Sequence, residues 1–435
     1  MVDRLFWRAG FGPSQRDRQT WTGQPVNALI DWFMSTPYAL APAAQPATWL
    51  GQPIDPTGAY DELQLEWLDR MRRVTNPLIE RLNFFWHRHF AVSIAFNIPY
   101  SHMLTYRDRL AQYSDLASNP TASFADLALE MTTEDAAMSV WLSLEENIKY
   151  RPNENYAREF MELFTLGVLD ANGSANYSQT DVEQLARAFT GYRLDLDSGT
   201  IFFKPQLFDA GLKTILGQSA AFDAPAAVQL VLSQPSHAPF LVSKLWAEFI
   251  AAPIPADALS ALVAAYVYSG WQIAPVIRGI LSHPLIFDSL EEPTMIKPPV
   301  VYAVGVVRAL GVPLEDGTVT AALWKMGQQP YHPPNVAGWE GGLSWLNTAT
   351  AVARFNLITA CQALLSPVAD VPDETADAAL ARAYADCGSP WLSSGTISML
   401  ESLSLRLPAL SKAQRLSRQY AFQAFILGGP DGQMM

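Results

Sequence analysis

The segment Asn153–Gly167, which reads NENYAREFMELFTLG, is the most informative stretch of this 435-residue chain. At about 100° per residue, Asn155, Arg158, Glu159 and Glu162 fall on one narrow arc of a helix. Tyrosine, phenylalanine, methionine and leucine side chains fill the rest of its surface. A surface helix has the opposite distribution, with one apolar stripe and a wide polar face. The sequence therefore predicts a buried helix whose polar arc faces other polar groups.

Helical periodicity continues through most of the chain. Apolar residues recur at i, i+3 and i+4, and the 31 prolines cluster between these segments, where a proline ends one helix or begins the next. The pattern predicts an all-α fold, a large multi-helical array that forms one domain over residues 1–435. The expected helices are 25–35, 60–74, 76–92, 103–118, 124–131, 135–144, 154–166, 180–191, 224–233, 238–250, 256–269, 272–282, 298–310, 316–326, 348–365, 373–386, 394–406 and 411–426.

Three segments do not follow the helical pattern. Residues 192–204 alternate in polarity around the turn-forming residues 197–199, which predicts one small β-hairpin. The segment 328–347 contains the stretch Gln328–Trp345, which is too rich in proline and glycine for a helix or a strand. Loops of this length are usually functional or wrapped around the core. The acidic stretch Val368–Thr375 is a candidate linker.

The composition excludes several classes of protein. Lys and Arg number 29 against 42 Asp and Glu, so the net charge of −13 argues against a nucleic-acid partner. A content of 49% hydrophobic and 16% charged residues excludes wholesale disorder. Cys361 and Cys387 could form one bridge, but they cannot build a disulfide framework or a four-cysteine zinc site. The longest apolar run, Val300–Val307, is too short to cross a membrane.

Glu159 and Glu162 are the first candidates for chemistry. Two carboxylates on one helix face, with Arg158 and Tyr156 nearby, could form a substrate or metal pocket. The alternative is a structural belt of ion pairs between helices. In both cases a buried charge needs a partner. We therefore expect these two glutamates, Arg158 and Asn155 to be largely buried, with at least one carboxylate bonded to a basic side chain.

His89 is the best acid–base candidate among the six histidines. It lies on the same helix face as Leu78, Leu82 and Phe85, so it points inward. The alternative is a core histidine whose hydrogen bonds are satisfied. His87 points to another side of the helix, so the two do not form a metal-binding pair. The sequence also contains no HExxH, GxSxG, Walker or complete GxGxxG motif. We expect no transition metal and no cofactor.

The loop Gln328–Trp345 supplies the candidate ligand-binding residues. Asn335 could offer an amide, and Trp339 and Trp345 could stack on a glycan or a peptide. The alternative is a loop that its two tryptophans fix to the body of the protein. We expect one of these rings to pack beside helix 154–166, which would place the loop over the polar arc. Asn155 would then join the ligand-binding set.

At these residues the chain resembles the domain-of-unknown-function family 1800 (DUF1800). The resemblance implies an all-helical, usually exported bacterial protein, although the opening residues of this chain lack the apolar run of a secretory signal. It also implies a frequent partner, a sulfatase- or phosphatase-like protein of family 1501, and no settled activity. The matching residues are Arg8–Pro13, Trp86–Phe90, Ala137–Met138, Asn153–Gly167, Asp181–Gly191, Asp209, Lys213–Gly217, Lys297–Pro299, Pro333–Leu346 and Arg354.

Two positions depart from the family pattern. Phe208 precedes Asp209 where relatives tend to have histidine, and Ser143 stands where an acidic residue is expected. If the missing histidine is a metal ligand in the family, a metal site is not expected in this chain.

Two functions from different classes fit these residues. The first is a bacterial envelope-type protein, periplasmic or extracellular, that binds a polymer or the sulfatase- or phosphatase-like partner. Its cleft would lie between helix 154–166 and loop 328–345. The second is a carbohydrate-active hydrolase or lyase that uses Glu159 and Glu162 with His89, Tyr156 and Arg158. A solvent-reached cleft with both glutamates at its floor would favour the enzyme.

Overall fold

The computed structural model describes residues 1–42, 47–290, 292–315, 317–365 and 368–435. Helices dominate this part of the chain, which confirms the predicted all-α class. Their bounds are α1 Val2–Arg8, α2 Gln15–Trp21, α3 Val26–Ser35, α4 Tyr60–Arg73, α5 Pro77–His89, α6 Tyr100–Gln112, α7 Phe124–Thr133, α8 Ala136–Trp141, α9 Asn155–Glu159, α10 Gln179–Ala188, α11 Ala224–Leu232, α12 His237–Phe249, α13 Ala256–Tyr268, α14 Ile273–Leu281, α15 Pro299–Leu310, α16 Thr318–Met326, α17 Thr348–Leu364, α18 Ala376–Asp386, α19 Ser394–Ser404, α20 Lys412–Gly428 and α21 Pro430–Gln433.

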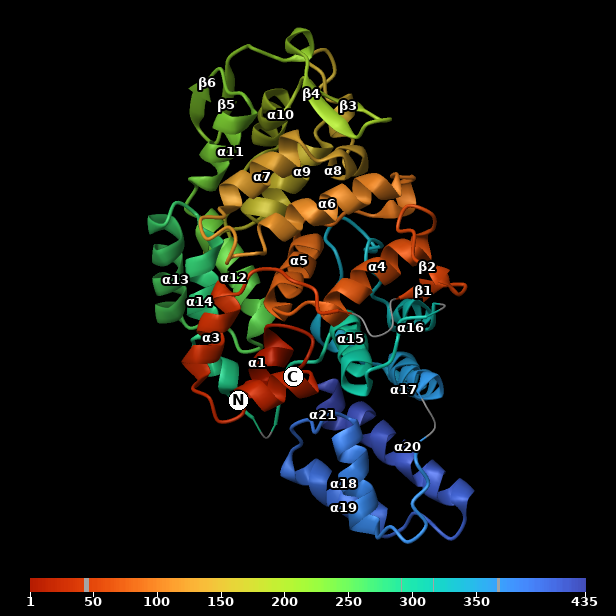
Figure 1. Cartoon of the computed structure of the whole chain (residues 1–435). Coiled ribbons are helices and arrows are strands. Elements are labelled where there is room, and N and C mark those ends of the chain that lie inside the picture. The colour runs from red at the N-terminus through yellow and green to blue at the C-terminus, as the bar shows by residue number, and fades with distance from the viewer. Residues whose placement is uncertain (43–46, 291, 316, 366–367) are drawn as a thin grey trace.

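The helices form an elongated array (Figure 1). Helices α18, α19 and α20 lie at one end, and α10 lies at the other end with two of the three small two-stranded sheets. The N- and C-termini lie close together, and Met1 and Met435 border the same small cavity. One cluster of buried apolar side chains extends through the chain from Leu5 to Met435. No helix in the described residues is long and apolar enough to span a bilayer.

Three two-stranded antiparallel sheets interrupt the helices in the described residues. The predicted hairpin is confirmed as β3 (Tyr192–Asp195) and β4 (Thr200–Phe203). The sequence analysis missed two others, β1 (Thr48–Trp49) with β2 (Gln52–Pro53), and β5 (Lys213–Ile215) with β6 (Gln218–Ala220). All four missed strands are two or three residues long, too short for alternation to show.

Helix boundaries differ from prediction mainly where helices are short. The helices α1 and α2, each seven residues long, were not predicted, because one or two turns give too little periodicity. The expected helix 316–326 begins at Thr318, and residue 316 lies outside the described residues. The expected linker 368–375 is held by ion pairs that include Arg382 Nη2 to Glu374 Oε2 at 2.6 Å and Arg415 Nε to Asp370 Oδ1 at 2.7 Å. Both cysteines are buried and unbridged.

Helix α5 lies at the centre of the packing. Every residue of Pro77–His89 except Arg88 is buried. Its polar side chains must therefore find partners on other elements. Glu80 accepts a hydrogen bond from Trp67 Nε1 of α4 at 2.8 Å, and Arg81 Nη2 lies 2.9 Å from Glu248 Oε1 of α12. These bonds fix α4 and α12 relative to α5.

Helix α15 packs closely on the N-terminal segment at Gly305. A Cβ atom at this position would lie 2.3 Å from Cη2 of Trp7. Lys297 also contacts Trp7, because its Nζ lies over the indole ring, 3.6 Å from the centroid. Lys297 Nζ also donates to the carbonyls of Asp431 and Gly432, at 3.2 and 2.9 Å. The indole ring thus joins both ends of the chain to α15.

Replacement of Gly305 by alanine tests this close approach. We expect the Gly305→Ala variant to lose about 2 kcal/mol of unfolding free energy, because the added methyl group overpacks the Trp7 site. The matched control is Gly395→Ala in α19, where the new Cβ would lie 4.0 Å from Ser393 Oγ. The control should be neutral or slightly more stable, because alanine favours helix. Urea denaturation followed by circular dichroism measures both, and equal stabilities would contradict the packing argument.

Candidate functional site

The predicted helix 154–166 consists of two consecutive parts with different helical geometry. Asn155–Glu159 is α-helical, and Phe160–Thr165 is a π-helix. Leu166 N donates to Met161 O at 2.9 Å, an i to i+5 bond. A π-helix has more residues per turn than an α-helix, so an arc drawn at 100° per residue does not hold beyond Glu159. The change of helix type therefore affects only the predicted position of Glu162, because the other three polar residues lie before Phe160.

The four polar residues of the arc are not largely buried, which corrects the prediction. Asn155 is exposed, and Arg158, Glu159 and Glu162 are half-buried. Arg158 Nη2 pairs with Glu154 Oε2 at 3.1 Å, and no ion pair joins Glu159 or Glu162 to a basic side chain in the described residues. Tyr177 Oη donates to Glu162 Oε2 at 3.3 Å. Burial raises the pKa of Glu159, and the nearby charge of Glu162 raises it further.

His89 is buried, as the prediction of an inward-facing side chain requires, but its position is that of a core histidine. Its Nε2 lies 3.0 Å from the Phe164 carbonyl. Burial, and then the charge of Lys244, lowers the pKa of His89 well below its usual value. Tyr156 is also buried, and its hydroxyl lies 2.8 Å from Thr132 Oγ1. His89 and Tyr156 therefore lie in the interior, whereas Arg158, Glu159 and Glu162 face solvent.

Three side chains satisfy consecutive carbonyls at the end of the π-helix. Besides His89 at Phe164, Lys244 Nζ donates to Leu163 O at 3.0 Å, and His237 Nδ1 lies 3.0 Å from Thr165 O. The last carbonyls of a helix have no partner within the helix, so outside donors are needed where the end is buried. Burial lowers the pKa of Lys244 to about 8 and that of His237 to about 4. These residues stabilise the helix end, and the sequence analysis missed Lys244 and His237.

The loop Gln328–Trp345 lies on α5. The Trp339 ring packs on Phe84, with ring centroids 5.7 Å apart, and on His87, at 5.4 Å. A Cβ atom at Gly338 would lie 2.7 Å from the Arg88 carbonyl. The ring contacts of Trp339 are thus with α5, which corrects the expected packing beside helix 154–166.

The remaining loop residues hold the loop in place. Trp345 is buried like Trp339, so neither ring has the exposed face that ligand stacking requires. The Trp345 carbonyl accepts a hydrogen bond from Arg354 Nη2 at 3.4 Å. Asn335 is exposed, and its Oδ1 accepts a hydrogen bond from Ala337 N at 2.8 Å within a turn. These contacts correspond to the alternative in which the tryptophans fix the loop to the body.

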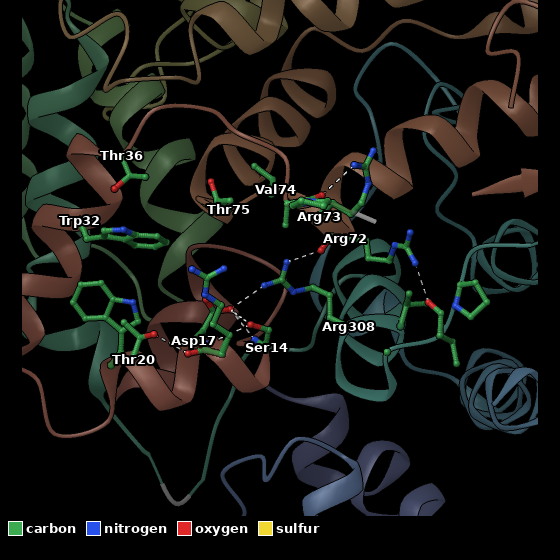
Figure 2. Close-up of a pocket in the computed structure, with 18 of the residues that line it drawn as sticks. Ser14, Asp17, Thr20, Trp32, Thr36, Arg72, Arg73, Val74, Thr75 and Arg308 are labelled. Carbon is green, nitrogen blue, oxygen red and sulfur yellow. Dashed lines mark hydrogen bonds and ion pairs between the residues drawn. The ribbon is translucent and has the colours of Figure 1, made fainter. Parts of the chain in front are cut away.

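A cavity of about 830 Å³ lies elsewhere, where α2, α3 and the C-terminal ends of α4, α15 and α17 meet (Figure 2). In this view Trp32 lies on one side, and Arg72, Arg73 and Arg308 lie on the other. We call this space the arginine cavity. Its polar and aromatic lining residues are Ser14, Arg16, Asp17, Thr20, Trp21, Trp32, Thr36, Arg72, Arg73, Thr75 and Arg308.

Ion pairs hold three of the four cavity arginines in place. Asp69 binds Arg72 through Oδ1 at 2.6 Å and Arg73 through Oδ2 at 2.7 Å. Arg308 Nη2 lies 3.1 Å from Asp17 Oδ2, and its Nη1 donates to the Arg72 carbonyl at 2.9 Å. Burial lowers the pKa of Arg308, and Asp17 opposes this effect. Four arginines against two aspartates leave a surplus of two positive charges.

Several hydrogen-bond donors of the cavity have no partner in the described part of the chain. The Arg16 guanidinium forms no ion pair or hydrogen bond there, and Arg16 is exposed. The same holds for the indole N–H groups of Trp21 and Trp32 and for the hydroxyl of Thr36. Free donors and a positive charge surplus are suited to a ligand that supplies acceptor oxygens.

A family model described as "Protein of unknown function (DUF1800)" matches residues 4–425. The chain belongs to the DUF1800 family. The match includes the arginine cavity, α5, the π-helix and the loop Gln328–Trp345, so all of these features lie within the family region of the chain. Comparisons with curated proteins and with solved structures gave no match.

Sequence reasoning did not find the arginine cavity in this DUF1800 chain. Its residues come from α2, α3, α4, α15 and α17 and from the segments next to them, and no catalytic or binding motif joins them in the sequence. The adjacent pair Arg72 and Arg73 at the end of a predicted helix was the only local signal. No group of three or more His, Cys, Asp or Glu side chains that could hold a metal lies within the described residues.

The buried His237 predicts a pH dependence of stability. Its pKa is lowered from 6.5 to about 4, so in the range between these values the unfolded chain binds a proton that the folded chain does not. Stability from this group is complete above pH 6.5 and is lost as the pH falls to 4, by about 3 kcal/mol. The His237→Gln variant keeps an amide donor, so its unfolding free energy should fall less over this range.

Urea denaturation at pH 4.5, 5.5, 6.5 and 7.5 measures this difference. The control is His332→Gln, at a half-exposed histidine of the loop. The control should keep the slope of the unaltered protein. Equal slopes for the unaltered protein and the His237→Gln variant would contradict a neutral, buried His237.

Proposed function

We propose that this DUF1800 protein is a binding protein whose ligand carries negative charge, and that the ligand occupies the arginine cavity. The observation that carries this proposal is the group of four arginines around one cavity of about 830 Å³ in a chain of net charge −13. Ligand cavities in proteins have volumes of about 300–1,000 Å³. A local positive surplus in an acidic protein concentrates anions at that place.

The predicted cleft between helix 154–166 and loop 328–345 supports binding less well. Trp339 and Trp345 are buried, and the Oδ1 atom of Asn335 is used in a turn. The arginine cavity offers the opposite situation, because Arg16 and two indole N–H groups are free to bind. We therefore keep ligand binding as the proposed function and assign it to the arginine cavity in place of the predicted cleft.

The sequence suggests a polymer as the ligand, and the cavity suits an anion. A polymer with acidic groups satisfies both. The sulfatase- or phosphatase-like partner that the resemblance implies would act on esters of anionic groups. Such a partner and this cavity would then share one class of ligand. The partner, like the envelope location, is part of the proposal.

Removal of Arg16 tests the proposal without disturbing the fold, because its side chain has no partner in the described structure. Titration with inorganic sulfate, followed by calorimetry, should show binding to the unaltered protein. We expect the Arg16→Ala variant to bind sulfate about fivefold more weakly, because one charge-assisted contact contributes about 1 kcal/mol. Binding should also weaken as sodium chloride is added.

The matched control is Arg406→Ala, which removes an exposed arginine that follows α19 and does not line the cavity. It should bind sulfate as the unaltered protein does. Equal affinity for sulfate in the Arg16→Ala and Arg406→Ala variants would contradict a site in the arginine cavity.

A second candidate, the hydrolase or lyase, is favoured by one observation. The pKa of Glu159 is raised by burial and by Glu162. Neighbouring carboxylates with different proton affinities can act as acid and base. This candidate no longer includes His89, since its Nε2 is bound to the Phe164 carbonyl in the interior. Arg158 could still position a substrate at the surface.

Release of reducing ends from acidic polysaccharides distinguishes the two candidates. The binding proposal expects no release by the unaltered protein and the same sulfate affinity in the Glu159→Gln variant. Release that is lost in Glu159→Gln but kept in Glu146→Gln, at an exposed glutamate, would establish the enzyme instead.

A further inference from the structure

The two indoles of the arginine cavity indicate that the ligand contains a ring. Trp21 and Trp32 lie in contact, with ring centroids 5.5 Å apart and planes inclined at 54°. Both are half-buried, and both line the cavity. Trp32 also packs on Phe6, at 6.3 Å, and on Phe33, at 5.3 Å, so the core fixes its orientation. Large aromatic faces beside water are costly to leave uncovered.

The inclination of the two indoles decides which rings they suit. Two parallel aromatic planes could hold a flat nucleobase between them, but planes at 54° cannot. Two inclined indoles in the cavity lining are better suited to a non-planar ring. The hydroxyl groups that line the same cavity, from Ser14, Thr20, Thr36 and Thr75, suit a ring that is itself rich in hydroxyl groups.

The hydroxyl side chains keep the capacity to bind such a ring. Thr20 Oγ1 donates to Arg16 O at 2.9 Å, and Thr75 Oγ1 donates to Ala39 O at 3.1 Å. Each oxygen can still accept a hydrogen bond from a ligand hydroxyl. The arginines and the indole N–H groups supply donors. Both donors and acceptors therefore line the cavity, as a hydroxylated ring with an acidic group requires.

We propose that the ligand is an acidic saccharide, in which a pyranose ring packs on Trp21 and its carboxylate or sulfate group binds the cavity arginines. This inference rests on the proposed anion site and adds the sugar ring to it. Arg16 would bind the acidic group, because its guanidinium is free. Trp21 would cover the ring, because Trp32 is already held by Phe6 and Phe33. The cavity volume of about 830 Å³ allows more than one sugar residue.

The test compares five probes by calorimetry: a galacturonate trisaccharide, a sulfated galactose trisaccharide, a neutral galactose trisaccharide, adenosine monophosphate and inorganic sulfate. We expect at least one acidic trisaccharide to bind about tenfold more tightly than sulfate and than the neutral sugar, through the stacked ring. Comparison of the two acidic trisaccharides shows whether the site prefers a carboxylate or a sulfate group. The Trp21→Leu variant should lose this advantage and keep its sulfate affinity, and the Trp21→Phe variant should retain most of it.

Each outcome separates the sugar inference from the proposed anion site. If the acidic trisaccharides bind no better than sulfate, or bind Trp21→Leu as well as the unaltered protein, the sugar inference is wrong and the anion site stands. If the Arg16→Ala variant binds sulfate normally, the anion site itself is wrong. Tighter binding of adenosine monophosphate than of either acidic trisaccharide would also overturn the inference. Retained sulfate binding by Trp21→Leu shows that the variant is folded.

Discussion

The whole fold depends on the burial of α5 together with its polar side chains. A helix that is covered on nearly all sides and still carries a glutamate, an arginine and two histidines can exist only where each of them finds a partner. The partners lie on different elements: Trp67 on α4 for Glu80, Glu248 on α12 for Arg81, and Tyr106 on α6 for His87. Because these bonds reach three different elements, they help to determine how the helices are arranged around α5.

The same requirement separates the structural histidines from a functional site. His89 and His237 satisfy carbonyls at the buried end of the π-helix, whose last carbonyls have no partner within the helix. Their burial keeps both neutral. The carboxylates Glu159 and Glu162 lie on the other, solvent-facing side, so the predicted acid–base group is divided between interior and surface. The ligand site that we propose is the arginine cavity, where unpartnered donors of the described residues lie close together.

Much of the fold could be predicted from sequence, and little of the site could. Helices of ten or more residues follow from their apolar period, and the hairpin at 192–204 follows from its alternation and its turn. The wheel for residues 153–167 grouped the polar side chains but could not show that their arc is partly open to solvent, and its constant 100° per residue does not hold in the π-helix. The arginine cavity could not be predicted, because Asp17, Arg72 and Arg308 are brought together only by tertiary packing.

Hydrogen–deuterium exchange with and without the acidic trisaccharide tests the placement of the site most directly. We expect the ligand to slow exchange in peptides that cover α2 and the C-terminal ends of α4 and α15, where the arginine cavity is formed. Peptides that cover residues 154–177 and the loop Gln328–Trp345 should exchange at the same rate in both samples. Protection confined to these two segments, with no change around the cavity, would contradict our account and return the site to Glu159 and Glu162.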